Sequence, residues 1–353
     1  MRPTVLVATV VHWPDDTRIR ERLIRTLSSE FEVVYAARSP GPSDKAGLEY
    51  VELRGARVVR NLHAIRLALG GAWDVLVIHD PELVLCGVLA RLLRRRPVVF
   101  DVHEDIPASA HTRAWVPRPL RMPLSVLMRG LLRLVEPVLT ITLAETGYQR
   151  LFARPHRTFP NFPDTTSYPE ASSTDDGPVV YLGDVTYERG ADIAVAACSS
   201  LQVPLRLIGR ITSETRSRLV AESGLGDRLT IDGLVPNRVA VRALAEASVG
   251  LAPLRDLPNY RYSQPTKILE YLAVGLPVVA SELPGTRELV EGLDAVFLVP
   301  PGDADALAQG TRRLLDSPGL ADSLRAAGRI RAQEFAWDRV TDRIEEIYRR
   351  VKG

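Results

Sequence analysis

Short apolar runs rich in valine and isoleucine recur along the whole chain, and longer helical patterns separate them. Such runs are typical of parallel strands that are covered on both faces and joined by crossover helices. The expected strands are 5–11, 32–36, 75–78, 98–102 and 138–142 in the first half, and 179–182, 205–208, 229–231, 249–252, 278–280 and 295–299 in the second. The pattern predicts an α/β fold with two doubly wound, Rossmann-like sheets.

The length of the chain, 353 residues, exceeds what one hydrophobic core usually spans, so two domains are expected. Near the middle, a stretch rich in Pro, Ser, Thr and Asp lacks periodicity and is typical of an interdomain linker. An amphipathic helical pattern closes the chain. We predict an N-terminal domain over residues 1–165, a linker over 166–177, a C-terminal domain over 178–335, and a final helix over 336–353 that packs back on the N-terminal domain.

The composition is that of a globular enzyme, with 46% hydrophobic and 25% charged residues. The two cysteines, Cys86 and Cys198, are too far apart for a disulfide framework or a Cys-based metal site, which fits a reducing compartment. The apolar start, residues 4–11, is too short to span a bilayer, and no small-residue cleavage site follows it. We therefore expect a cytoplasmic protein.

Charge divides unevenly along the chain. Residues 1–165 carry 23 Lys and Arg against 17 Asp and Glu, whereas the remainder carries 22 against 26. The Arg94–Arg96 run and the 118–133 stretch could face the phosphates of a lipid or an acidic polymer. A solvated basic face on core helices is the alternative. Peripheral contact with the inner face of a membrane is thus one of two open interpretations.

Three of the six histidines, His12, His79 and His103, follow predicted strands. In open α/β sheets ligands bind beyond the carboxyl ends of the strands, so these side chains are site candidates. A structural role for each is the alternative. His103 is the strongest candidate, because the carboxylates around it in the sequence DVHED could fix its tautomer or take a proton. Glu104, next to His103, is a further candidate.

The segment after His12 leads into a helical pattern. Asp16 or Thr17 is expected to cap this helix. Arg18 is then a candidate acceptor-side contact, and exposed helical charge is the alternative interpretation.

The first strand of the second half, residues 179–182, ends at Gly183, and a short loop then runs to Arg189 before the next helix. Such a loop lets backbone N–H groups approach an anion, and the guanidinium of Arg189 could hold a diphosphate. The spacing is not that of a Walker loop or a dinucleotide fingerprint. Arg210, just beyond the next strand, is a further candidate contact.

The segment PTKILEYLAVGLPVVAS, beginning at Pro265, predicts a short helix. Pro265 suits the first helical position, Gly275 the C-terminal cap, and Pro277 the start of the next strand. Thr266, Lys267 and Glu270 then share one face of the helix, because Glu270 is four residues from Thr266 and three from Lys267.

Lys267 is unusual in this helix, because a cation in the first turn opposes the positive end of the helix dipole unless an anion binds there too. It is one of only three lysines among 45 basic residues. An ion pair with Glu270 on a solvated face is the alternative interpretation. Glu270 is placed to accept hydrogen bonds from ribose hydroxyls, as acidic residues do in other nucleotide sites.

This segment resembles the donor-binding signature of GT-B glycosyltransferases, in particular the family-four, or group 1, retaining enzymes, which include bacterial mannosyl-, glucosyl- and N-acetylglucosaminyltransferases. The resemblance covers nearly the whole chain, in the order DDTRIRERLIRTL, DVHE, Asn161-Phe162-Pro163, GDVTYERG and EFAWDRVTDRIEEIYRRV. It implies two Rossmann-like domains that face each other across a cleft, with the acceptor bound by the N-terminal domain, residues 1–165, and the donor bound by the C-terminal domain, residues 178–335. The acceptor-side residues would include His12, Arg18, His79 and Glu104. Lys267 and Arg189 would grip the donor diphosphate, Glu270 the ribose, and His103, as the catalytic residue, the sugar ring or reacting centre.

The same resemblance implies a hexosyltransferase that moves a sugar from a UDP or GDP sugar to a glycan, lipid-linked or natural-product acceptor, with retention of configuration. The expected donor contacts are completed by Gly183, Thr266, Pro265, Tyr262 and Arg210. The chain departs from the family pattern at Tyr262, which stands where a glutamate usually contacts the sugar. It also carries Asp184 where a basic residue is common.

No metal and no cofactor are expected. Asp303-Ala304-Asp305 imitates the metal-binding motif of the other glycosyltransferase fold, but its context predicts that Asp303 is a helix N-cap. A nucleotide-sugar epimerase and a noncatalytic sugar-nucleotide-binding protein are the alternative functions. Nucleic acid is not expected as a partner.

Overall fold

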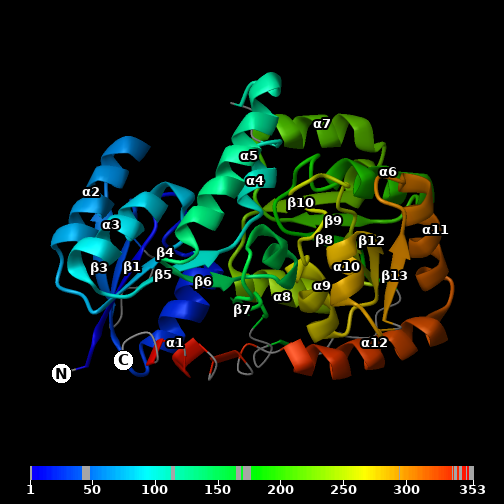
Figure 1. Cartoon of the computed structure of the whole chain (residues 1–353). Helices are drawn as coiled ribbons and strands as arrows, with labels where there is room; N and C mark the ends of the chain where they lie inside the picture. The colour runs from blue at the N-terminus through cyan, green and yellow to red at the C-terminus, as the bar shows by residue number, and fades with distance from the viewer. Residues whose placement is uncertain are drawn as a thin grey trace. The chain divides into compact units, whose positions relative to one another are not determined.

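The computed structural model describes residues 2–41, 48–112, 116–163, 168–169, 176–293, 295–335, 337, 340–341, 344–346 and 348–349. Its contacts divide the chain into two compact units, one of residues 1–161 with 337–353 and one of residues 162–336 (Figure 1). Each unit holds one parallel sheet with helices on its faces, which confirms the predicted α/β fold with two Rossmann-like domains. Most of the predicted linker, 166–177, and much of the predicted final helix, 336–353, lie outside the described residues.

The sheet of the N-terminal unit has the strand order β3-β2-β1-β4-β5-β6-β7, and all its pairs are parallel. Its strands are β1 (Thr4–Ala8), β2 (Glu32–Arg38), β3 (Glu49–Leu53), β4 (Val75–Ile78), β5 (Val98–Val102), β6 (Thr140–Leu143) and β7 (Arg157–Thr158). Its helices are the π-helix η1 (Thr17–Ile24), α1 (Arg25–Leu27), α2 (Arg57–Gly70), η2 (Pro81–Leu83), α3 (Val84–Arg94), α4 (Ile106–Ser109), α5 (Arg118–Val135) and η3 (Thr146–Leu151).

The first strand ends three residues earlier than predicted. Beyond Ala8, the amides of Val10 and Val11 donate to the carboxylate of Asp80 rather than continuing the ladder, and the Thr9 hydroxyl donates to the same carboxylate at 2.8 Å. A carboxylate that follows the neighbouring strand therefore turns the chain out of the sheet and toward His12.

The sheet of the C-terminal unit has the order β10-β9-β8-β11-β12-β13 and is also parallel. Its strands are β8 (Val179–Leu182), β9 (Leu205–Ile208), β10 (Leu229–Gly233), β11 (Val249–Ala252), β12 (Val278–Ser281) and β13 (Val296–Val299). Its helices are α6 (Ala191–Leu201), α7 (Ser213–Ser223), η5 (Gly226–Arg228), α8 (Asn237–Ala245), α9 (Thr266–Val274), α10 (Pro284–Leu289), α11 (Ala304–Leu315), α12 (Pro318–Ala332) and η6 (Gln333–Phe335).

Helix α9 confirms most of its predicted limits. Pro265 is the N-cap residue rather than the first helical one, since its ψ of 101° is extended. Gly275 ends the helix in the left-handed conformation, at φ 78°, which only glycine adopts without strain. Asp303 caps α11 as predicted, because its carboxylate accepts from the Ala306 amide at 2.8 Å.

The described residues of the final segment belong to the N-terminal unit. The indole N–H of Trp337 donates to the hydroxyl of Thr26 at 3.1 Å, and the rings of Tyr348 and Phe31 meet edge to face. No helix in the described ranges is both long and apolar enough to cross a bilayer.

Candidate functional site

A cavity of about 230 Å³ lies beyond the carboxyl ends of β1, β4 and β5. It brings together His12, His79, His103 and Glu104, four residues that were predicted for the acceptor side and the reacting centre. The remaining lining residues are Val11, Arg57, Asp80, Pro81, Glu82 and Ile106. These residues are scattered over the first third of the chain. They meet in one cavity because each lies at or near the carboxyl end of a parallel strand.

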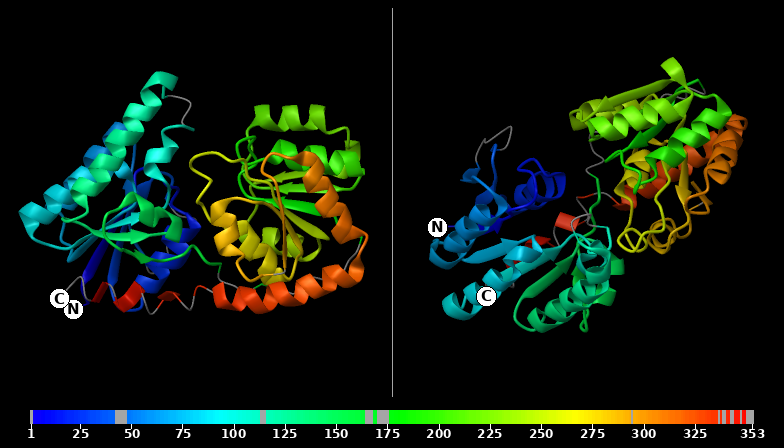
Figure 2. Two further views of the ribbon diagram at one scale, coloured as in Figure 1. Left: turned by 45° about the vertical axis from the view of Figure 1, so that its right-hand side comes forward. Right: turned by 90° about the horizontal axis from the view of Figure 1, so that it is seen from above.

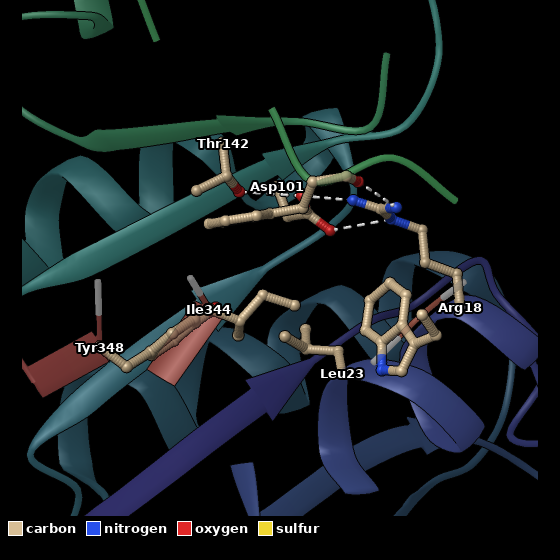
Figure 3. A pocket seen from close by; sticks show the side chains of 8 residues that line it. Arg18, Leu23, Asp101, Thr142, Ile344 and Tyr348 are labelled. Atoms are coloured by element: carbon tan, nitrogen blue, oxygen red, sulfur yellow. Dashed lines mark hydrogen bonds and ion pairs between the residues drawn. The ribbon is translucent and has the colours of Figure 1, made fainter. Parts of the chain in front are cut away.

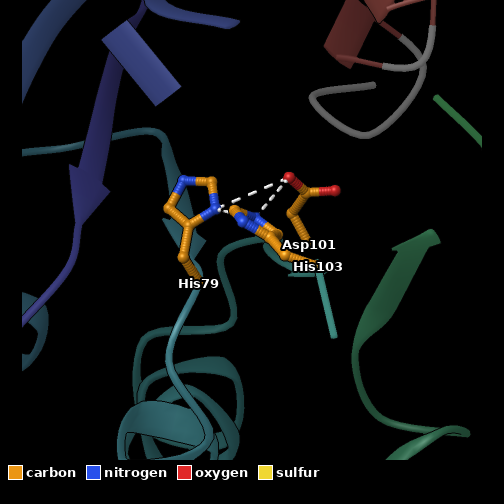
Figure 4. Close-up of side chains that lie close together, drawn as sticks. All are labelled: His79, Asp101 and His103. Carbon is orange, nitrogen blue, oxygen red and sulfur yellow. Dashed lines mark hydrogen bonds and ion pairs between the residues drawn. The ribbon is translucent and has the colours of Figure 1, made fainter. Parts of the chain in front are cut away.

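His103 forms a hydrogen-bonded cluster with His79 and Asp101 (Figure 4). Its Nε2 lies 2.9 Å from an oxygen of Asp101 and 2.7 Å from Nδ1 of His79. An ionised carboxylate only accepts hydrogen bonds, so Nε2 of His103 must carry the proton. Nδ1 of His103 then holds the lone pair and is the basic nitrogen of the ring.

Burial, with smaller contributions from His79 and Arg18, lowers the pKa of His103 to about 4, although Asp101 opposes this shift. His103 is therefore a neutral imidazole at neutral pH. A neutral imidazole of fixed tautomer can accept a hydrogen bond or a proton from a hydroxyl group, whereas an imidazolium cannot.

Arg18 does not occupy the acceptor-side position that we expected (Figure 3). It is buried, and its Nε and Nη2 donate to both oxygens of Asp101 at 3.2 and 3.0 Å. Its Nη1 donates to the carbonyl of Phe159 at 2.8 Å. All three nitrogens thus bind the protein, because the helix that Asp16 caps directs this side chain inward, behind Asp101. Arg18 positions the carboxylate that orients His103.

Asp101 is held ionised by this arrangement. Burial alone would raise its pKa, but Arg18 and the two histidines hold the pKa well below its usual value. The hydroxyl of Thr142 donates to the same carboxylate at 2.8 Å. Asp101, His79 and His103 offer three atoms within 4.8 Å of one another, a spacing that could suit a metal ion. Since Asp101 is already bound by Arg18 and Thr142, the cluster fits a hydrogen-bonded network. The expected absence of a required metal stays a prediction.

His12 lies at the more exposed side of the cavity. Its Nδ1 is 3.2 Å from Asp16, and its Nε2 is 3.6 Å from Asp80. Burial would lower the pKa of His12, but the hydrogen bond to Asp16 and the charges of Asp80 and Glu104 raise it. Asp16 also caps η1, as predicted, by accepting from the amides of Arg18 and Ile19. The cavity therefore holds one histidine that protonates readily and one that does not.

Lys267 is the central residue of the second candidate site, in the C-terminal unit. It is only 6% exposed, its Nζ lies 3.6 Å from the centre of the Tyr181 ring, and Nζ has no hydrogen-bond partner among the described residues. A solvated ion pair with Glu270, the alternative interpretation, does not describe this environment. Burial, followed by repulsion from Arg189, lowers the pKa of Lys267 well below its usual value.

The loop after β8 lies directly against Lys267. Gly183 has a φ of 111°, and a Cβ there would lie 3.6 Å from both Cε and Nζ of Lys267. Arg189, at the end of the loop, lies with its guanidinium 5.5 Å from the centre of the Tyr260 ring. Arg210 is exposed, 3.7 Å from Asp184. The loop thus brings an open backbone and a second cation close to the first.

The other expected donor residues surround the start of α9. Pro265 is buried, and Thr266 and Glu270 are half-buried. The hydroxyl of Tyr168 donates to Glu270 at 3.4 Å. Tyr262 is 37% exposed. The expected residues therefore include one buried cation, Lys267, a half-buried one, Arg189, and polar groups that are more open, an arrangement suited to an anion with a hydroxyl-bearing extension.

Residues 177–317 match the family model for glycosyl transferases group 1. The chain is a glycosyltransferase of the GT-B fold, and it resembles group 1 over the matched residues. It is 25% identical over 299 residues to the phosphatidyl-myo-inositol mannosyltransferase of Mycolicibacterium smegmatis, covering 80% of this chain and 72% of that protein. It is 33% identical over 151 residues to the amylovoran biosynthesis glycosyltransferase AmsK of Erwinia amylovora, covering 41% of this chain and 37% of the other.

Two solved structures share the fold of this glycosyltransferase over its full length. Sucrose-phosphate synthase from Thermosynechococcus elongatus matches with a TM-score of 0.81 at 20% identity, and 99% of each chain is covered. Anabaena Alr3699/HepE, in complex with UDP and glucose, matches with a TM-score of 0.77 at 15% identity, again over 99% of each chain.

Among the site residues of the glycosyltransferase that were not predicted from the sequence, four lie directly beside predicted ones: Asp80, Tyr181, Tyr260 and Tyr168. Asp80 was detectable, because it directly follows His79 at the end of a strand. Tyr181, Tyr260 and Tyr168 carried no signal, since their positions beside Lys267, Arg189 and Glu270 depend on the packing of distant segments.

Replacing Asp101 with asparagine is expected to destabilise the glycosyltransferase by about 3 kcal/mol, because Arg18 then keeps a buried charge without its counterion. Because the folded-state pKa of Asp101 is low, its stabilisation is present above the unfolded pKa of about 3.9 and is lost as the pH falls below that value. Urea unfolding of Asp101→Asn at pH 7 measures this loss.

The double variant Arg18→Met/Asp101→Asn should recover part of the stability, since it removes the unpaired charge. Asp15→Asn is the control, because Asp15 is exposed and a surface ion pair such as the one it makes with Arg20 is worth less than about 1 kcal/mol. Equal losses in Asp101→Asn and Asp15→Asn would contradict the assignment of Asp101 as the centre of a buried network.

Proposed function

We propose that the protein transfers a hexosyl group from a nucleotide-diphosphate sugar, a UDP or GDP sugar, to an acceptor hydroxyl with retention of configuration. The observation that carries the proposal is Lys267, a buried ammonium with no hydrogen-bond partner among the described residues, close to a second cation, Arg189. Two like charges repel in a partly buried site, and an anion bound between them would remove this repulsion. A diphosphate supplies such an anion.

Departure of the nucleoside diphosphate is the step that Lys267 and Arg189 would assist. Negative charge grows on the leaving phosphate as the bond to the sugar breaks, and preorganised cations stabilise that charge more in the transition state than in the bound donor. The amides at the start of α9 would add to this effect. Glu270 would accept hydrogen bonds from the ribose, with Gly183, Thr266, Pro265, Tyr262 and Arg210 as the remaining donor contacts. No metal and no cofactor are part of the proposal.

The histidine cavity is proposed as the acceptor side. His12, His79 and Glu104 would bind acceptor hydroxyls, while neutral His103 contacts the transferred sugar or the reacting centre. No side-chain nucleophile is assigned; the departing phosphate would assist deprotonation of the acceptor, the route that retention implies.

The relatives support particular substrate classes without fixing them. Alr3699/HepE was solved with UDP and glucose, which supports a UDP sugar. A mannosyltransferase that acts on phosphatidyl-myo-inositol supports a lipid-linked acceptor, and the α-D-kanosaminyltransferase of Streptomyces kanamyceticus, 26% identical over 191 residues, supports a natural product. A glycan is the third class. We propose a cytoplasmic location with peripheral contact to the inner face of the membrane.

A thermal-shift screen of UDP-, GDP-, ADP- and dTDP-sugars tests the donor assignment. A ligand that binds only the folded protein stabilises it by about 2.7 kcal/mol at 100 times its dissociation constant, so the correct base should raise the melting temperature by several degrees. The free diphosphate of that base should do so too, because it makes the same contacts. If none of the four series shifts the melting temperature, the donor site is wrongly assigned.

A further inference from the structure

Three helices lie on one face of the N-terminal sheet: α2, α3 and α5 (Figures 1 and 2). They connect β3 to β4, β4 to β5 and β5 to β6, always in the same direction across the sheet. Right-handed crossovers in one direction place their helices on the same face, whereas η1, which joins β1 to β2 in the opposite direction, lies on the other face. The three helices therefore form one layer.

The outer surface of this layer is apolar. Twelve of the eighteen large hydrophobic side chains that are exposed among the described residues lie on these three helices. Five of them are on α5, at 56–72% exposure: Leu120, Met122, Val126, Leu127 and Leu134. Only Leu132 and Val135 are buried along the 18 residues of α5. Such a concentration on one face is typical of an interaction surface.

The charge of the layer has a single sign. The helices α2, α3 and α5 carry nine arginines and no aspartate or glutamate. Arg129 and Arg133 are exposed next to the apolar residues of α5. Two copies of such a face would repel each other, so self-association through it is disfavoured. Arginines mixed with exposed leucine, valine and methionine are the composition of helices that lie in a lipid headgroup region.

We propose that the outer face of α2, α3 and α5 binds an anionic membrane surface, with its apolar side chains in the headgroup region and its arginines on lipid phosphates. Arg57 of α2 and Glu82 of η2 also line the histidine cavity, so the membrane face adjoins the proposed acceptor side. The proposal does not depend on the identity of the donor or acceptor, because it concerns binding alone.

Vesicle flotation of the full chain tests the proposal. Vesicles of phosphatidylcholine with 30% phosphatidylglycerol should carry the protein upward at low salt, whereas pure phosphatidylcholine vesicles should not, and 0.5 M NaCl should reduce the bound fraction. Arg129→Gln/Arg133→Gln should lower the partition coefficient by about 30-fold, since each basic residue near an anionic surface adds about fivefold. Val126→Ser/Leu127→Ser/Leu134→Ser should lower it by about tenfold or more.

Matched controls use equally exposed residues elsewhere. Val220→Ser/Leu234→Ser/Ile330→Ser replaces three exposed side chains of the C-terminal unit, and Arg54→Gln/Arg242→Gln replaces two exposed arginines. Neither should change binding by more than about twofold, and thermal melts verify that every variant is folded.

Three outcomes would overturn the proposal: wild-type protein that stays unbound with anionic vesicles, control variants that lose binding as strongly as the α5 variants, or a wild-type dimer that the α5 variants convert to monomer. The last outcome would assign the face to a second copy of the chain.

Discussion

Lys267→Met is expected to lower kcat by about 10²–10³-fold while it raises the stability of the ligand-free protein by about 2 kcal/mol. The loss follows from removing one preorganised charge at the leaving diphosphate. The gain follows because a buried ammonium without a hydrogen-bond partner is replaced by an apolar side chain of similar length. Steady-state kinetics with the donor identified by the thermal screen, together with urea unfolding of the free protein, measure both effects.

Arg238→Met is the matched control, since Arg238 is also a cation in the first turn of a C-terminal-unit helix but is exposed. It should change neither quantity. Lys267→Arg should keep more activity than Lys267→Met, because it keeps the charge. If Lys267→Met loses stability and keeps turnover, Lys267 is a structural residue and not a phosphate contact.

The stability gain of Lys267→Met should depend on pH. The folded-state pKa of Lys267 is lowered, whereas the unfolded value is about 10.4. Between these values the unfolded chain binds a proton that the folded chain does not, so wild-type stability rises with pH and the gap to the variant narrows. Repeating the unfolding measurements at pH 7, 8 and 9 tests this trend, and a gap that widens with pH would contradict the assigned environment.

His103→Ala is expected to lower kcat by about 10²-fold or more and to leave the dissociation constant of the nucleoside diphosphate unchanged. His103 would act at the sugar or the reacting centre, and positioned acid–base or polar groups contribute about 10²–10⁴ in rate. Calorimetric titration with the diphosphate and kinetics with the complete donor separate binding from turnover.

Protonation of His103 should not lower the reaction rate near neutral pH. Burial lowers its pKa to about 4, so the loss of activity from its protonation should occur only as the pH approaches that value. His63→Ala is the control, because His63 is on α2 and does not line the cavity. Equal kcat for His103→Ala and wild type would remove His103 from the reaction.

The fold was largely predictable because continuous apolar runs mark buried parallel strands. β4, β5, β8, β9 and β11 begin and end at their predicted residues. β3 was missed because it is an edge strand whose glutamates interrupt the apolar run, and β7 because it has only two residues. A continuous apolar run indicates a strand that is buried on both faces of a sheet. The edge strands β3 and β7 have no such run.

The site was predictable to the extent that it depends on strand ends. The positions of His12, His79 and His103 in one cavity follow from the topology of a parallel sheet. The inward direction of Arg18 could not be predicted, because it depends on Asp101, 83 positions away, and on a π-helix that the sequence pattern does not distinguish from an α-helix. The burial of Lys267 beneath the Gly183 loop likewise depends on contacts between segments that are distant in sequence.

The balance between donor consumption and sugar transfer tests the proposed function most directly. Wild-type protein would be incubated with the donor that the thermal screen identifies, with and without acceptors of the three classes, and the products followed by proton NMR and mass spectrometry. We expect one nucleoside diphosphate to be released per sugar transferred, only when one of the acceptors is present, with the anomeric configuration of the donor kept in the product. Conversion of the donor to another nucleotide sugar without an acceptor would contradict the proposed function and identify an epimerase.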